Sequence, residues 1–182
     1  FVRRLRRADP QRVWPVEVEP GEEVQVDFGT GAWVIDPQSG KIYVSTGAGV
    51  SIFDPVRETF EAFSETRVDD LAFSPDGDLW GSSWPERGTI VQFSPLGRGQ
   101  AVVRLEAKVD SLAFGRPASP LAGLLFASTN DGKLEMIDLA TMQHLTVAGG
   151  GSHGETVLAT ADGALLIAQS RQIDRLAPRI AP

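Results

Sequence analysis

The 182-residue sequence contains no cysteine, two histidines and one tyrosine. Without cysteine, the protein cannot form disulfides, thiolate metal sites or cysteine nucleophiles. No apolar stretch approaches the roughly 20 residues that a transmembrane helix requires, so we expect no membrane partner. The P-loop and HExxH motifs are also absent, which removes two common signatures of nucleotide-binding and zinc-dependent enzymes.

We expect no signal peptide in this sequence. Residues 1–12 contain five arginines and one acidic residue, but no apolar stretch follows them, and the compartment stays open. Residues 13–182 hold 12 basic and 23 acidic side chains, a net charge of −11. This negative charge repels a phosphate backbone, so we expect no nucleic-acid partner for residues 13–182. The start at Phe1 and the proline-rich end predict a piece of a longer protein, with 179–182 as a linker.

What the sequence does contain is a repeat. The segment VDDLAFSPDGDLWGSS at 68–83 returns as VDSLAFGRPASPLAGLLFAST at 109–129 and as ETVLATADGALLIAQS at 155–170. A weaker copy, AWVIDPQSGKIYVST, occupies 32–46. Each copy has an apolar strand, a turn, a second apolar strand, a third strand and a more polar fourth one. The turn tripeptides PDG, NDG and ADG supply glycine where a tight hairpin needs positive φ.

Four antiparallel strands in about 40 residues is the size of one β-propeller blade. The sequence therefore predicts an all-β protein, a partial or small β-propeller of about three and a half to four blades of four antiparallel strands. A sandwich would fit the strands but would not explain the repeated unit. We expect an N-terminal segment at 1–31 and propeller blades over 32–178, divided as 31–68, 69–109, 110–154 and 155–178.

These blades resemble the group that includes NHL repeats, gluconolactonase-type hydrolases and streptogramin lyases. The resemblance is carried by LAFSPDGDLW at 71–80 and GTIVQFSP at 88–95, and it extends over about residues 32–178. It implies a propeller but no particular activity, because such blades occur in enzymes, adhesins and scaffolds.

The last blade stops after its third strand, near 172–176. Either residues 13–28 supply an outer strand and close a small ring, or the blades form one arc of a larger propeller. An open arc exposes strand edges, and we expect it to self-associate through them.

The opening RRLRRADPQRVWPVEVEPGEEVQVDFGTGAW resembles the segment that leads into the catalytic core of IstA-type insertion-sequence transposases, over about residues 1–35. The resemblance puts Asp27 at the first of three metal-binding carboxylates in an RNase H-like core. Two-metal catalysis needs several converging carboxylates. Because propeller blades follow in place of that core, we interpret the segment as a transposase fragment without DNA-cleaving activity.

Alignment of the copies puts Gly31, Asp69, Asp110 and Glu155 at one position, just ahead of each inner strand. Inner strands line the channel of a propeller, so the three carboxylates would share a ring near one mouth. Such oxygen ligands suit a hard cation such as Ca²⁺. The resemblance to gluconolactonase-type proteins implies a metal-binding cluster at the channel, and the alternative is a set of solvated loop acids.

His153 lies in the glycine-rich loop GGGSHGE, where a histidine can act as a general base near neutral pH. The resemblance to streptogramin lyases implies such a role, and a solvated side chain is the alternative. Trp84 and Arg87 lie in WGSSWPERG. There an aromatic ring and a cation can form a ligand-binding patch, unless Trp84 packs in its loop and Arg87 is solvated.

Three hypotheses about function follow. The first is a non-catalytic recognition or scaffolding module that binds a protein, a glycan or another surface ligand over the propeller face, without a cofactor. The second is a metal-dependent lactonase or lyase that uses Asp69, Asp110 and Glu155 for Ca²⁺ and His153 as base. The third is a DNA-binding remnant of a transposase in residues 1–12.

Overall fold

The computed structural model describes residues 32–85 and 88–177. These residues form fifteen β-strands and no α-helix, as the alternation of apolar and polar residues predicts. The predicted all-β fold class is therefore confirmed. No helix capable of crossing a membrane occurs within these two ranges.

The strands form four antiparallel sheets, here called blades 1 to 4. Blade 1 contains β1 (Trp33–Ile35), β2 (Ile42–Thr46), β3 (Gly49–Asp54) and β4 (Thr59–Ser64). Blade 2 contains β5 (Val68–Phe73), β6 (Leu79–Ser83), β7 (Thr89–Phe93) and β8 (Gly99–Arg104). Blade 3 contains β9 (Val109–Phe114), β10 (Leu124–Thr129), β11 (Leu134–Asp138) and β12 (His144–Ala148). Blade 4 contains β13 (Gly154–Ala159), β14 (Leu165–Gln169) and β15 (Ile173–Leu176).

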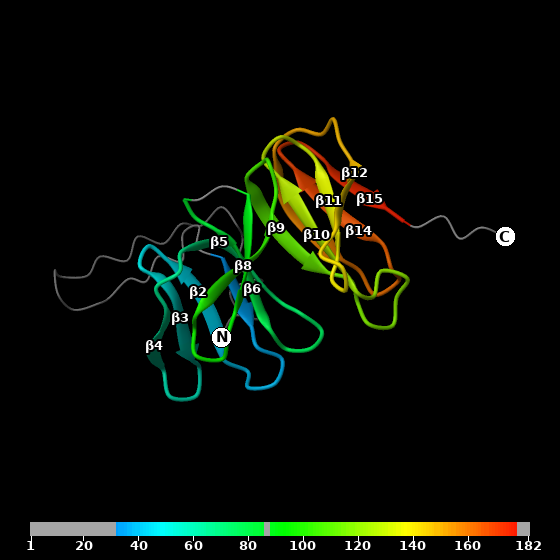
Figure 1. Ribbon diagram of the computed structural model, residues 1–182. Coiled ribbons are helices and arrows are strands. Elements are labelled where there is room, and N and C mark those ends of the chain that lie inside the picture. The colour runs from blue at the N-terminus through cyan, green and yellow to red at the C-terminus, as the bar shows by residue number, and fades with distance from the viewer. Residues whose placement is uncertain (1–31, 86–87, 178–182) are drawn as a thin grey trace, which may run out of the picture.

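The blades stand side by side in an open arc, with blade 1 at one end and blade 4 at the other (Figure 1). Within each blade the strands follow one another in chain order. The first strands of adjacent blades lie next to each other, β5 beside β9 and β9 beside β13, so they are the inner strands of a propeller-like arrangement. The residues 13–28, considered as an extra strand, lie outside the described residues.

Glycine turns join the first two strands of blades 2 and 4 and the second and third strands of blade 3. Gly77, Gly132 and Gly163 have φ values of 92°, 77° and 79°, which an L side chain rarely adopts. Each N–H donates to the carbonyl three residues earlier, as Gly77 does to Ser74 over 3.0 Å. The turns predicted from PDG, NDG and ADG are therefore confirmed.

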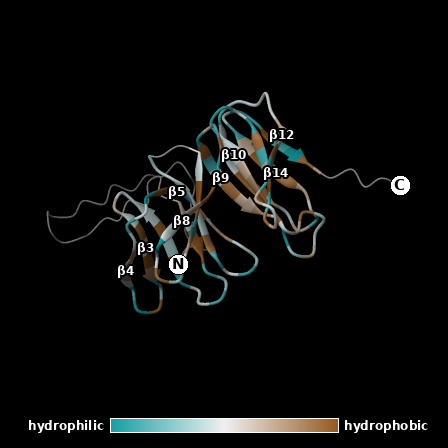
Figure 2. Cartoon of the chain, viewed as in Figure 1, coloured by the Kyte–Doolittle hydropathy of each residue, from teal (hydrophilic) through white to brown (hydrophobic). Residues whose placement is uncertain are grey.

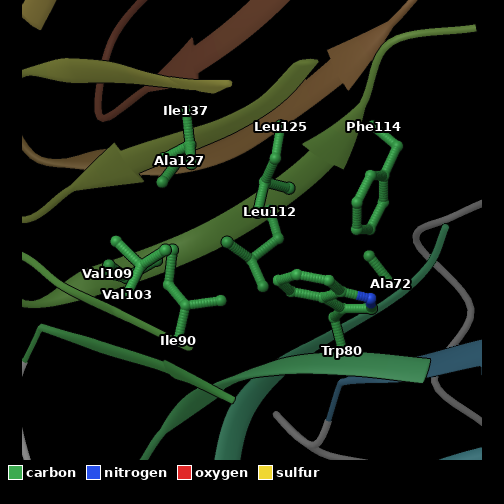
Figure 3. Close-up of a cluster of buried hydrophobic side chains, with 10 residues drawn as sticks. All are labelled: Ala72, Trp80, Ile90, Val103, Val109, Leu112, Phe114, Leu125, Ala127 and Ile137. Carbon is green, nitrogen blue, oxygen red and sulfur yellow. The ribbon is translucent and has the colours of Figure 1, made fainter. Parts of the chain in front are cut away.

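The hydrophobic core lies between the blades rather than within them. Apolar residues concentrate on the strands, and polar residues in the turns (Figure 2). Ten buried side chains fill the junction of blades 2 and 3 (Figure 3), namely Ala72, Trp80, Ile90, Val103, Val109, Leu112, Phe114, Leu125, Ala127 and Ile137. The Trp80 and Phe114 rings meet edge to face with centroids 5.6 Å apart. Trp80 therefore packs between blades 2 and 3.

Each inner strand of blades 2, 3 and 4 contains a β-bulge at its second residue. The pairing register skips Asp69 in β5, Asp110 in β9 and Glu155 in β13. The prediction that these residues lie just ahead of the strands was wrong, because each strand begins two residues earlier than expected. A bulge residue is left out of the ladder, so its side chain is redirected relative to its neighbours.

Candidate functional site

A basic residue precedes each bulge acid by two positions. The three triplets are Arg67-Val68-Asp69, Lys108-Val109-Asp110 and His153-Gly154-Glu155. In each triplet the base comes just before the inner strand, and the acid is the bulge residue. Because the inner strands of adjacent blades lie side by side, the base of one blade can contact the acid of the blade before it.

Lys108 makes this contact between blades 2 and 3. Its Nζ lies 2.7 Å from Asp69 Oδ2 and 3.4 Å from Asp110 Oδ1. The hydrogen bond to Asp69 is the main reason that the pKa of Lys108 lies above its ordinary value. The ammonium group therefore stays charged near neutral pH. It holds the two carboxylates together and is not available as a base or nucleophile.

Trp84, which follows β6, completes the surroundings of Lys108. The Lys108 Nζ lies 4.9 Å from the centroid of the indole ring, a distance that allows a cation–π interaction. The Trp84 side chain is 40% exposed. Part of the ring surface is therefore accessible to a ligand.

Asp110 also faces His153 of the next blade. His153 Nδ1 lies 3.7 Å from Asp110 Oδ2, which is longer than a hydrogen bond. The Asp110 side chain is 9% exposed, and its Oδ2 is buried without a hydrogen-bond partner. His153 is 55% exposed. This end of the cluster thus combines an unused carboxylate oxygen with an accessible imidazole.

The residue after the bulge acid connects blade 2 to blade 3, and blade 3 to blade 4. Leu112 N–H donates to Asp70 Oδ2 over 2.7 Å, and Val157 N–H donates to Ser111 Oγ over 3.3 Å. Burial raises the pKa of Asp70 against the opposing effect of the hydrogen bond from the Leu112 N–H. The two bonds fix the spacing of adjacent inner strands, and with it the spacing of the bulge side chains.

A cleft of about 300 Å³ lies between blades 3 and 4, beside the loop that contains His153. Residues 149–151, all glycine, form part of its wall. Ser152 N–H donates to Gln169 Oε1 over 2.7 Å, and the Gln169 amide donates to Asp174. The cleft gives room for a polar ligand group beside Ser152 and Gly154, the chain neighbours of His153.

The structure brings four predicted site residues together. Asp69, Asp110 and Trp84 contact Lys108, and His153 lies on the other side of Asp110. Lys108 itself was not among the residues predicted from the sequence. The signal that could have identified Lys108 is the repeated base two residues before each acid. An alignment of the acidic positions alone does not show this repeated basic residue.

Other predicted residues cannot be placed in this way. Asp27 and Arg87 lie outside the described residues, as does the side chain of Glu155, although its backbone forms the bulge of β13. In the part of the chain that the structure describes, no three His, Asp or Glu side chains are arranged to hold a metal ion. The Ca²⁺ site formed by three acids therefore stays a prediction.

No protein-family model matches the sequence, and no curated protein matches it either. Solved structures match the fold. A structural-genomics protein of unknown function from Bacteroides thetaiotaomicron is 12% identical with a TM-score of 0.69, over 80% of this chain and 46% of that one. A candidate gluconolactonase is 17% identical with a TM-score of 0.65, over 80% of this chain and 59% of that one. The extracellular domain of a candidate one-component system from B. thetaiotaomicron is 17% identical with a TM-score of 0.61, over 80% of this chain and 21% of that one.

At such identities the similarities show the fold alone. They agree with the propeller arrangement, and the chain spans 21% to 59% of the length of these three structures. The resemblance to gluconolactonase-type blades is thus supported at the level of architecture. The resemblance of residues 1–35 to transposases finds no support in the comparisons.

Proposed function

We propose that this propeller segment is a non-catalytic recognition module whose ligand binds at the inner-strand bulges. The observation that carries the proposal is the position of Lys108 between Asp69 and Asp110. A metal-dependent enzyme leaves its carboxylates open to the cation. Here an ammonium group with a raised pKa neutralises them, and a divalent ion would have to displace it.

Three features support a polar ligand that donates hydrogen bonds, such as a glycan or a protein loop. The exposed part of the Trp84 ring offers a surface for stacking. Asp110 Oδ2 is a buried acceptor without a partner, and leaving such a group unsatisfied costs free energy. His153 is exposed beside it and can donate or accept a hydrogen bond.

An array of immobilised oligosaccharides tests this proposal. It would be probed with the chain, with a Trp84→Ala/His153→Ala variant and with Leu96→Ala as a control. Leu96 is 94% exposed in the turn between β7 and β8. We expect the control to bind like the chain, and the double variant to bind at least about 10-fold more weakly, because it loses a stacking surface and a hydrogen bond.

Binding to a sugar that the double variant retains would contradict recognition at the bulges. Failure to bind any sugar would contradict the glycan form of the proposal and leave a protein loop as the ligand. In that case the same variants would be compared against peptides displayed on phage.

A metal-assisted lactonase or lyase is the second candidate. The fold similarity to a candidate gluconolactonase favours it, as does the proximity of His153 to Asp110, which can position a general base. Glu155 would then join the two aspartates in binding Ca²⁺. Hydrolysis of glucono-1,5-lactone with and without Ca²⁺ tests this candidate. We expect no rate above that of buffer, whereas a Ca²⁺-dependent rate lost in His153→Ala would favour the enzyme.

A further inference from the structure

Blade 4 exposes a face that the other blades bury. Val50, Ile90, Leu134 and Ile173 occupy the same register in the third strands of successive blades. The first three are 1%, 0% and 2% exposed, because the next blade packs over them. Ile173 is 73% exposed. Blade 4 thus has an apolar side chain at the position that the next blade buries elsewhere, but no blade packs over it in the described residues.

Blade 1 shows the same contrast on its opposite face. Trp33, Leu71, Leu112 and Val157 share one register in the first strands. Leu71, Leu112 and Val157 are 5%, 5% and 3% exposed, since the preceding blade covers them. Trp33 is 57% exposed. Each end of the arc therefore presents one half of a blade junction.

Two surfaces are defined by these registers. The trailing face, on blade 4, consists of Leu158, Leu166, Ala168 and Ile173. The leading face, on blade 1, consists of Trp33, Ile35, Ile42 and Phe53. The junction of blades 2 and 3 shows how two such faces pack. At the same registers, blade 2 has Trp80 and Ile90 on its trailing face. Blade 3 has Leu112 and Leu125 on its leading face, and the four side chains belong to one buried cluster.

We propose that the trailing face of one molecule packs against the leading face of a second copy of this chain. The two faces match because the internal junctions already join a trailing face to a leading face at the same registers. Contact between unlike faces is heterologous, so the pair either closes into a ring or adds further copies. It specifies the self-association that the sequence analysis expected only from open strand edges.

The polar connection between blades supports the same pairing. Thr156 occupies the position of Asp70 and Ser111 in blade 4. Those two side chains accept the backbone N–H of Leu112 and Val157 in the following blade. Thr156 is exposed and offers an equivalent hydroxyl oxygen. In the paired molecules, the hydroxyl oxygen of Thr156 would accept a hydrogen bond from the backbone N–H of Trp33 in the second copy.

Sedimentation velocity over a concentration series tests the proposal with two variants, Trp33→Glu and Ile173→Glu. A carboxylate buried without a partner is strongly unfavourable, so we expect each variant to associate more than about 100-fold more weakly than the unchanged chain. Each variant keeps one intact face. An equimolar mixture should therefore form a 1:1 dimer that neither variant forms alone. Leu96→Glu, outside both faces, should associate like the unchanged chain.

Three results would overturn the proposal. Loss of association in Ile173→Glu but not in Trp33→Glu would indicate a symmetric contact between trailing faces. A mixture that stays monomeric would exclude the pairing of unlike faces. A monomeric unchanged chain would exclude a second copy and would leave these faces to further blades of a longer polypeptide. Circular dichroism would establish that each variant is folded, which the exposure of both side chains favours.

Discussion

The junction between blades 2 and 3 and the junction between blades 3 and 4 share one backbone plan but differ in their polar side chains. In the first, Asp70 accepts the N–H of the next inner strand, and Lys108 contacts the bulge acids of both blades. In the second, Ser111 takes the place of Asp70, and His153 takes the place of Lys108 at a longer distance. Charged groups therefore hold the first junction, and a weaker neutral bond holds the second.

The difference indicates where a ligand has room to bind. Asp110 belongs to both junctions, with Oδ1 toward Lys108 and Oδ2 toward His153. Only Oδ2 lacks a hydrogen-bond partner, and the cleft of about 300 Å³ also lies at the second junction. We infer that the Lys108 ammonium is structural and that the Trp84 ring and His153 are the parts available for recognition.

The largest effect is expected where the junctions are alike, in their apolar cores. Trp80 and Phe126 occupy the same register and are 4% and 2% exposed. Replacing either with Ala should lower the free energy of unfolding by about 3–5 kcal/mol, measured by urea denaturation. Trp80→Phe should cost less, because its buried indole N–H has no partner to lose. A loss below about 1 kcal/mol for Trp80→Ala would contradict a shared core.

The next effect distinguishes the two basic residues. Lys108→Met leaves the carboxylate of Asp110 buried without a cation, and should lower the free energy of unfolding by about 1–3 kcal/mol. His153→Ala removes an exposed and more distant partner, and should cost less than about 1 kcal/mol. Urea denaturation of both variants measures the contrast. Equal losses would show that the two junctions do not differ as described.

A smaller effect is expected at the connecting residues. Asp70→Ala leaves the Leu112 N–H without its acceptor and should cost about 1–2 kcal/mol, and Ser111→Ala about 0.5–1 kcal/mol. Asp70→Asn keeps an acceptor without burying a charge, so it should be as stable as the unchanged chain at pH 7. Thermal unfolding measures all three. If Asp70→Asn were as unstable as Asp70→Ala, the result would contradict this account.

The smallest effect is a pH dependence at the alkaline end. Because the pKa of Lys108 is raised by Asp69 and Asp110, its stabilising effect is fully present below its ordinary pKa of 10.5. The effect is lost as the pH rises through the higher pKa of the folded state. Stability measured from pH 9 upward should therefore fall more steeply in the unchanged chain than in Lys108→Met. Parallel curves would mean that Lys108 does not interact with the two acids.

The blades could be predicted from the sequence because alternation and glycine turns are local signals. The bulges could not, since one extra residue shifts the pairing without disturbing the apolar pattern. Lys108 was missed because its contact with Asp69 joins different blades, and no local pattern records it. The exposure of Ile173 could not be predicted either. Ile90 is the same residue type at the same register, and the two differ in exposure only because a blade packs over Ile90.

The central claim is that Lys108 fills the place between Asp69 and Asp110 that a metal ion would need. Calorimetric titration with Ca²⁺ tests it most directly, on the unchanged chain and on an Asp69→Asn/Asp110→Asn variant shown to be folded by circular dichroism. We predict no heat of binding in either protein. Micromolar binding by the unchanged chain that disappears in the variant would contradict the claim and would favour a metal-dependent enzyme.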